Sequence, residues 1–245
     1  MTQRVVQSPV ARSGVAEPGV AESGVVQSGV VQPVPRPRLL DGENLPAAPR
    51  QGRSREKRAQ LLAAGLALFG ERGYEATAVD AIAERAEVAI GSFYQHFRTK
   101  RQLLLVLMDQ LLEGLEQLDL RPKGAATIRD ALRNLLQGAF SRDLAFAGAY
   151  RAWREAILLD PSLAPRQEQI ERWTQARVTR VFETFLQLPG ARRDVNVPVL
   201  ARLMDRFFWD LLGEATHLAA SELEPILESV TDLLYHALFT DAIHK

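Results

Sequence analysis

The stretch from Val79 to Lys100 constrains the fold of this chain more than any other. It reads VDAIAERAEVAIGSFYQHFRTK. The spacing of its apolar residues predicts two short helices joined by a tight turn at Glu87-Val88. The second predicted helix is rich in aromatic residues, has no acidic residue and ends in a basic cluster. This layout is typical of a helix-turn-helix, whose second helix lies in the major groove of DNA.

A longer amphipathic helix is predicted just before this stretch. Ser54 is a suitable cap for its start, and Gly73 can end it in a left-handed conformation. One face of this helix carries four large apolar residues, Leu61, Leu62, Leu68 and Phe69.

Inward-facing residues can also be assigned in the helix-turn-helix. Thr77 followed by Asp80 resembles a capping box, with Asp in place of Glu or Gln. We expect an inward stripe in the first helix and a buried aromatic pair in the second. These residues are Val79, Ile82 and Ala86, then Phe93 and Phe97.

The rest of the chain predicts more helices and no convincing strand. Pro and Gly pairs separate the helical patterns, which span about 99–119, 127–142, 145–159, 165–188, 196–219 and 222–240. The fold class is therefore all-α, with about nine helices. We divide the chain into a low-complexity tail, a helix-turn-helix domain and a larger helical domain, at 1–50, 51–101 and 102–245.

The tail contains a Gly-Val pair every five residues between Gly14 and Val30, followed by clustered prolines. Such a sequence disfavours a helix and lacks the alternation of a strand, so residues 1–50 are predicted to be disordered. A tolerated repeat expansion explains this tail more simply than a binding function.

Composition sets further limits. The formal net charge of the 245 residues is zero, but residues 51–101 carry nine basic and six acidic side chains, a net charge of +3. This asymmetry favours a DNA-facing end. The chain has no cysteine, which excludes disulfides and thiolate metal sites. We find neither a secretory signal nor a run of roughly 20 apolar residues, and expect a cytoplasmic protein without a membrane partner.

The segment FGERGYEATAVDAIAERAEVAIGSFYQHFRTKRQLL resembles the DNA-binding domain of the tetracycline-repressor (TetR) family of transcriptional regulators. The resemblance covers about 47 residues, and beyond it the chain matches only in the number and length of helices. The matching positions are Phe69, Gly73, Thr77, Ile82, Ala83, Gly91, Ser92, Phe93, Tyr94, His96, Phe97 and Lys100.

Two positions depart from the family pattern. Glu87 stands where the family usually has a glycine, and costs roughly 1 kcal/mol if that position is left-handed. Ala89 stands where a serine often caps the recognition helix, which loses about 1 kcal/mol.

The resemblance implies a DNA-contacting surface. Thr77, Tyr94 and Lys100 would hold phosphates, while Gln95 could read adenine and Ile90 a thymine methyl group. The full predicted set is Arg53, Arg55, Thr77, Ile90, Gly91, Ser92, Tyr94, Gln95, His96 and Lys100. Each of four members has a simpler interpretation: packing for Tyr94, solvation for Gln95, capping or packing for His96, and an exposed helix start for Lys100.

The resemblance also implies a homodimer and an effector pocket. The dimer would form through the last two helices, about 196–240, and would bind a palindromic or near-palindromic DNA operator. Their apolar surfaces comprise Leu200, Leu203, Met204, Phe207, Phe208, Leu211 and Leu212, then Ile226, Val230, Leu233, Leu234, Ala237 and Leu238. A small hydrophobic effector would contact residues among Met108, Leu112, Phe140, Phe146, Tyr150, Trp153, Trp173, Phe182 and Phe185, although aromatics at helical spacing are more often core.

Other functional classes fit less well. Glu214 and His217 form a Glu-x-x-His pair, but helical di-iron sites need two such pairs and no second occurs. No nucleophile motif or phosphate-binding loop is present, so we expect neither an enzyme, a bound metal nor a cofactor. A helical protein-binding adaptor would leave the 77–100 pattern unexplained. A repressor released by its effector is the main hypothesis, and an activator or a ligand-independent regulator stays open.

Overall fold

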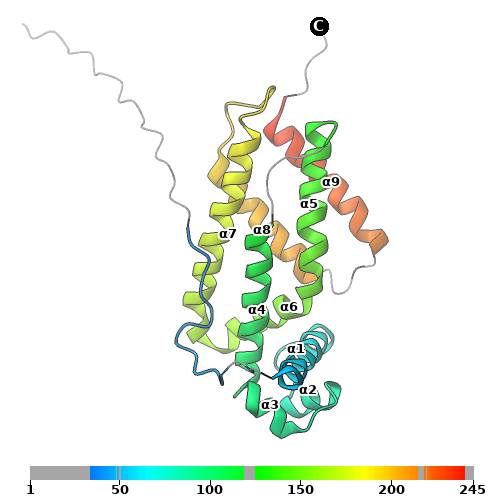
Figure 1. The fold of residues 1–245 in the computed structure, drawn as a ribbon. Helices are drawn as coiled ribbons and strands as arrows, with labels where there is room; N and C mark the ends of the chain where they lie inside the picture. Colours follow the sequence, from blue (N-terminus) through cyan, green and yellow to red (C-terminus); the bar gives the residue numbers. More distant parts are fainter. Residues whose placement is uncertain are drawn as a thin grey trace, which may run out of the picture. The chain divides into compact units, whose positions relative to one another are not determined.

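The computed structural model describes residues 34–47, 49, 51–118, 125–214, 218 and 220–240. The regular secondary structure of these residues is helical, without a named strand, as the sequence predicts. The helices are α1 (Gly52–Arg72), α2 (Val79–Arg85), α3 (Ile90–His96), α4 (Lys100–Gln117), α5 (Ile128–Asp143), α6 (Ala147–Leu159), α7 (Ala164–Phe185), α8 (Val197–Glu214) and α9 (Ala220–Leu238). Short 3-10 turns at Leu144–Phe146 and Pro161–Leu163 flank α6 (Figure 1).

Helices α1, α2 and α3 gather around one apolar core (Figure 1). Phe69, Ile82, Phe93 and Phe97 have no exposed surface, which confirms the predicted inward faces. Gly73 ends α1 at a φ of 81°, as predicted, but the two predicted N-terminal caps were wrong. Gln51, not Ser54, precedes α1, and Ala78 precedes α2 without any side-chain cap.

Helix α4 runs from the end of α3 into the larger helical bundle (Figure 1). The Thr99 hydroxyl caps its start by accepting a hydrogen bond from the Gln102 backbone N–H. α6 crosses α1 so closely that a Cβ at Gly148 would lie 2.5 Å from the Leu66 carbonyl oxygen. One continuous core therefore links the two helical domains that we predict at 51–101 and 102–245.

Residues 34–46, here called the strap, pack against the helical bundle. The prediction that all of 1–50 is disordered was therefore wrong for this segment. Leu39 has no exposed surface, and its carbonyl oxygen accepts a hydrogen bond from Arg166 of α7. The Glu43 carboxylate lies 2.6 Å from Arg101 and 2.9 Å from Arg166. Arg36 pairs with Asp109 of α4 at 2.7 Å. Sequence bias could not reveal this packing, because the partners lie far along the chain.

Residues 1–33, 48 and 50 of the predicted tail lie outside the described residues. His217 and the side chain of Glu214, the pair considered for a metal, lie outside them too. Within the part that is described, no group of three or more potential ligands could hold a metal ion. No described helix is long and apolar enough to span a membrane.

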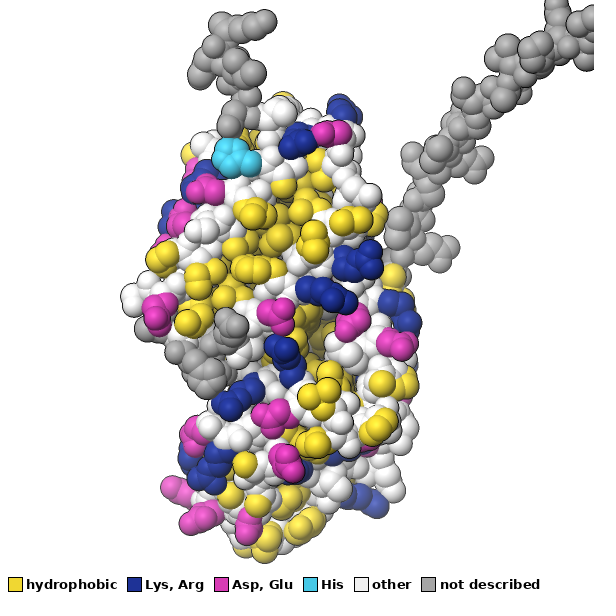
Figure 2. Space-filling view, turned by 180° about the vertical axis from the view of Figure 1, so that it is seen from behind, with side chains coloured by type: hydrophobic (Ala, Val, Ile, Leu, Met, Phe, Trp, Pro, Cys, Tyr) yellow, Lys and Arg dark blue, Asp and Glu magenta, His cyan; other side chains and the backbone are white. Residues whose placement is uncertain are grey.

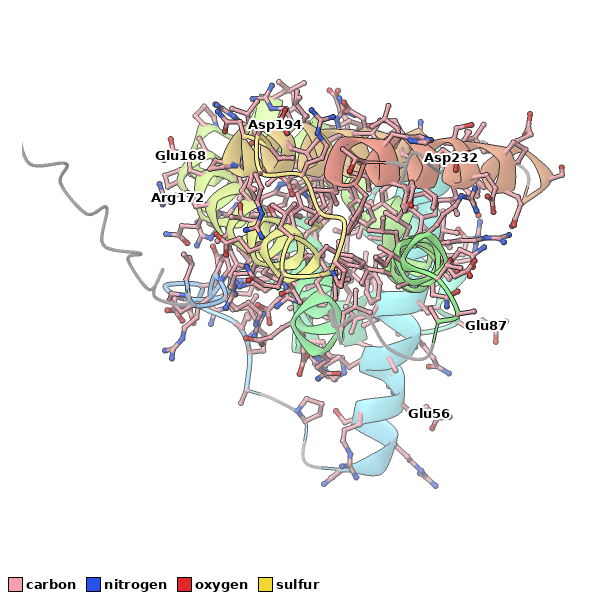
Figure 3. The ribbon with its side chains drawn as sticks, turned by 90° about the horizontal axis from the view of Figure 1, so that it is seen from above. Glu56, Glu87, Glu168, Arg172, Asp194 and Asp232 are labelled. Carbon is pink, nitrogen blue, oxygen red and sulfur yellow. The ribbon has the colours of Figure 1, made fainter. Side chains whose placement is uncertain are left out.

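The second part of the bundle consists of α5, α7, α8 and α9 around a separate apolar cluster. α7 packs along α8, and α5 packs along α9. Ion pairs reinforce the second contact: Arg129 of α5 lies 2.6 Å from Asp232 and 2.8 Å from Glu228 of α9. Asp232 lies on the outer side of the bundle in Figure 3.

Candidate functional site

The outer face of α3 is the first candidate site. Phe93 and Phe97 fasten the inner face of this helix in the core, so its opposite face is directed to solvent. Ile90 is 49% exposed and Tyr94 53% exposed, and Gly91 and Gln95 are also exposed. No Cβ contact restricts Gly91, so another molecule can approach the backbone there. The face is free of acidic side chains and presents apolar, aromatic and amide groups together.

Two residues predicted on this face lie on the inner side instead. Ser92 is 8% exposed and His96 is 6% exposed. His96 Nε2 makes no hydrogen bond within the described residues. Burial lowers the pKa of His96, and the nearby charges of Arg58 and Lys57 lower it further. Because the side chain is buried, we interpret His96 as a packing residue rather than a groove contact.

Thr77 is a second correction. Its side chain has no exposed surface, and its hydroxyl donates to the Gly73 carbonyl oxygen at 2.6 Å. The hydroxyl therefore closes the link between α1 and α2 and is not available to a phosphate. The family pattern marks Thr77 correctly, but its role in this chain is structural.

Lys100 is the third correction. Its ammonium donates to the carbonyl oxygens of Tyr74, Glu75 and Thr77 at 2.7 to 3.0 Å. It also lies 4.6 Å from the centre of the Tyr74 ring. All three N–H groups of an ammonium are thus used. Lys100 ties the start of α4 to the α1–α2 link and has no free donor for a phosphate.

The turn between α2 and α3 has the strain that the sequence suggests. Glu87 has a φ of 54°, in the left-handed region that favours glycine. Its side chain points into solvent (Figure 3). Ala89 begins α3 without a side-chain cap, as predicted.

Basic side chains flank the exposed face of α3. Arg53 and Arg55 are exposed in the first turns of α1. Arg98, which our site prediction omitted, is exposed directly after α3. The Gln102 side chain accepts a hydrogen bond from the Arg98 backbone N–H and so fixes this end of the helix. The signal for Arg98 was present in the basic cluster that closes the motif.

A second candidate site is an apolar face on α8 and α9. Figure 2 shows a broad hydrophobic area on the side of the bundle where these helices lie. Leu203 is 60% exposed, Phe207 40% and Leu233 60%. Several other residues predicted for this face are instead core residues of the same chain. Leu211, Leu212, Leu234 and Leu238 are all buried.

The third candidate site is a cavity of about 140 Å³ among α5, α7, α8, α9 and the end of α4. Phe140, Trp173 and Phe182, three of the residues that the sequence analysis assigns to an effector pocket, line this cavity. The other six predicted pocket residues do not line it. Five of them are buried elsewhere in the apolar cores: Met108, Leu112, Tyr150, Trp153 and Phe185. The sixth, Phe146, is partly buried and packs against the core that contains Trp153.

Asp205 is a cavity residue that sequence reasoning missed. It is 4% exposed, and the Trp209 indole N–H donates to its Oδ1 at 3.1 Å. Burial raises the pKa of Asp205 to about 6, against the opposing effect of hydrogen bonds from Thr174 and Trp209. In the sequence, Asp205 stands inside an apolar helix pattern, which is the signal that could have found it.

Comparison with known proteins places the helix-turn-helix in a family. The sequence model described as "Bacterial regulatory proteins, tetR family" matches residues 61–107. The transcriptional repressor KstR of Rhodococcus jostii is 30% identical over 118 residues, which is 47% of this chain and 55% of that protein. The transcriptional activator FasR of Mycolicibacterium smegmatis is 39% identical over 84 residues, 31% of this chain and 38% of that protein. The chain thus spans about half or less of these relatives.

Solved structures extend the likeness to the whole bundle. A TetR family transcriptional regulator from Pseudomonas syringae has a TM-score of 0.51 and 26% identity, covering 76% of this chain and 98% of its own. A γ-butyrolactone receptor has a TM-score of 0.59 at 21% identity, covering 76% and 90%. The second likeness shows the fold alone. The matched helix-turn-helix, the curated relatives and the shared bundle all support a TetR family regulator.

Proposed function

We propose that this chain is a DNA-binding transcriptional regulator that reads its operator with the outer face of α3. The observation that carries this proposal is the exposed set Ile90, Gly91, Tyr94 and Gln95 on a helix whose other face is locked by Phe93. An exposed face of this kind, on the second helix of a helix-turn-helix, is the part that enters the major groove.

The exposed side chains suit different parts of DNA. Gln95 can form two hydrogen bonds with adenine, and Ile90 can contact a thymine methyl group. Tyr94 can donate to a phosphate oxygen, and Arg53 and Arg98 can neutralise phosphates beside the groove. The base-contacting residues should therefore set specificity, whereas the arginines should set affinity and its dependence on salt.

We also propose that the chain acts as a homodimer through α8 and α9. Leu203, Phe207 and Leu233 would otherwise leave large apolar side chains in water, which is typical of an interface. A two-fold dimer places two α3 helices about one DNA turn apart, which requires an operator with dyad symmetry.

The dimer can be tested with matched leucine variants. Leu203→Glu combined with Leu233→Glu should convert the dimer to a monomer, since four charges would be buried at the interface. Leu158→Glu is the control, because Leu158 is 83% exposed on α6, outside this face. Sedimentation measures the mass. A wild-type monomer, or a dimer that persists in the double variant, would refute this part.

We also propose regulation by a small apolar effector, and the cavity lined by apolar side chains supports this proposal. An effector releases DNA only if it binds the non-binding conformation of the dimer more tightly. Changing the populations from 99:1 to 1:99 requires roughly 5.5 kcal/mol of differential binding. Repression is the favoured direction because several relatives are named repressors, and FasR, named an activator, makes activation the second candidate.

The first test is a footprint on the DNA beside the gene, with a salt titration and a scrambled competitor. We expect a near-palindromic site bound at about nanomolar affinity, as is typical of specific regulators. Gln95→Ala should weaken it, whereas Gln187→Ala, which removes an exposed glutamine beyond α7, should not. Equal and weak binding to both DNAs would contradict the proposal.

A further inference from the structure

One ionisable carboxylate stands in the wall of a largely apolar cavity. Of the residues that line the cavity, only Thr174, Arg177 and Asp205 carry polar side chains apart from two tryptophans. Asp205 is 4% exposed and contributes to the wall from α8. A carboxylate in such surroundings is costly unless it is paired with a cation or protonated.

Asp205 has no cationic partner in the part of the chain that is described. The neutral indole N–H of Trp209 donates to its Oδ1 at 3.1 Å, and the neutral hydroxyl of Thr174 is its other hydrogen-bond donor. No Lys, Arg or His nitrogen of a described residue lies within ion-pair distance of this carboxylate. The ring of Tyr150 stacks on Trp209 with centres 4.8 Å apart, which holds the indole in place.

The other two polar groups of the cavity are already engaged. Arg177 Nη2 donates to the Leu115 carbonyl oxygen at 2.6 Å, and its guanidinium lies 5.0 Å from the centre of the Trp173 ring. The Thr174 hydroxyl can donate to Asp205, and the Ile170 carbonyl oxygen of its own helix, 3.1 Å away, is a second acceptor for the same hydrogen. The carboxylate of Asp205, whose hydrogen-bond donors are neutral, is the one acidic group among the residues that line the cavity.

We propose that the effector of this chain is an apolar molecule with a positively charged nitrogen, which donates to the Asp205 carboxylate. This inference rests on the proposed regulatory function and names the class of its ligand. The ligand's N–H would supply the missing counter-charge, and its body would fill the apolar wall. Trp173, Trp209 and Phe208 add aromatic faces, which attract cations.

The chemistry of the wall discriminates among ligands. A neutral alcohol can donate to the carboxylate but leaves its charge uncompensated. An anion would be repelled by the negative charge of Asp205, and Arg177, the one cationic side chain of the wall, already donates to the Leu115 carbonyl oxygen. The cavity of about 140 Å³ suits one aromatic ring with a short arm, since a 150 Å³ engineered cavity binds benzene.

The test compares four probes on one skeleton: 2-phenylethylamine, 2-phenylethanol, ethylbenzene and phenylacetate. Binding is measured at pH 7.5 by calorimetry on the purified full chain without DNA. The amine should bind about tenfold more tightly than the alcohol or ethylbenzene, as one charge-assisted hydrogen bond can provide. Phenylacetate should bind most weakly.

Variants then locate the effect. Asp205→Asn should remove the preference for the amine and leave ethylbenzene binding within about threefold, a small energy on the affinity scale. Asp210→Asn is the matched control, because the Asp210 side chain is 67% exposed on the same helix and pairs with Arg154. It should retain the preference. If Asp205→Asn fails to fold, the four-probe comparison on the wild-type chain decides alone.

Several results would overturn the inference: equal binding of the amine and its neutral analogues, tighter binding of phenylacetate, no binding of any probe at its solubility limit, or an amine preference that survives Asp205→Asn. If the wild-type chain does not bind DNA specifically, the proposed function is overturned instead. Because calorimetry is done without DNA, it tests the ligand inference separately from the DNA-binding proposal. Asp205-dependent amine binding that does not weaken operator binding would overturn the effector role alone.

Discussion

Replacing Asp205 by asparagine should stabilise the protein. The substitution exchanges a buried charged hydrogen-bond acceptor for a neutral one of nearly the same shape. The pKa of Asp205 rises from 3.8 to about 6 in the folded chain because the carboxylate is buried. A shift of about two units corresponds to about 3 kcal/mol at 1.36 kcal/mol per unit. Asparagine keeps an oxygen that can accept from Trp209, so most of this energy should be recovered.

The sign of the effect depends on pH. Between pH 4 and 6 the folded state binds more protons at Asp205 than the unfolded state, so its contribution to stability falls as pH rises. The full penalty is present above about pH 6 and absent below about pH 4. Asp205→Asn should thus be about 2–3 kcal/mol more stable than wild type at pH 7.5, and the difference should vanish near pH 4.

The assay is urea denaturation at a series of pH values and one fixed protein concentration, since dimerisation would add a concentration-dependent term. Asp210→Asn, at an exposed site of the same helix, should change the free energy of unfolding by less than about 0.5 kcal/mol. The reasoning is refuted if Asp205→Asn is less stable than wild type at pH 7.5, or if its advantage does not depend on pH.

Three further predictions concern the turn, the α4 start and the strap. Glu87→Gly should raise the free energy of unfolding by about 0.5–1 kcal/mol, because glycine adopts a left-handed φ without strain. Glu84→Gly should lower the free energy of unfolding, because glycine destabilises the interior of a helix such as α2. Urea denaturation measures both changes. Lys100→Met should lower the free energy of unfolding by about 2–3 kcal/mol because three carbonyls lose a charged donor, and an unchanged denaturation midpoint would contradict this. Glu43→Gln should speed trypsin cleavage in the strap, because it weakens the ion pairs of Glu43 with Arg101 and Arg166. Asp194→Asn, which breaks an exposed ion pair with Arg192 (Figure 3), should leave the cleavage rate unchanged. Equal cleavage rates for the Glu43→Gln variant and the wild type would contradict the proposed anchoring.

The sequence predicted the helical fold because each long helix buries one face and therefore leaves a periodic pattern. Breakers such as Pro161 and Gly73 then marked the ends to within a few residues. The family pattern placed α2 and α3 correctly, and their buried aromatic residues Phe93 and Phe97 could be assigned from spacing alone.

Individual roles were harder to predict. Helix α3 has only seven residues, so periodicity fixes its strongest inward positions but not borderline ones such as Ser92 and His96. Thr77 and Lys100 bond to backbone carbonyls that only the folded chain brings within reach. The strap and Asp205 depend on contacts across distant segments, which local composition does not encode.

The most direct test of the account is selection of DNA from a random library by the purified protein. The account predicts an enriched motif with dyad symmetry and half-sites about 10 base pairs apart. Ile90→Ala and Gln95→Ala should change the preferred bases within each half-site. Arg53→Ala should weaken binding to all sequences alike. No enrichment, or a motif unaffected by the Ile90 and Gln95 variants, would contradict the claim that the outer face of α3 reads DNA.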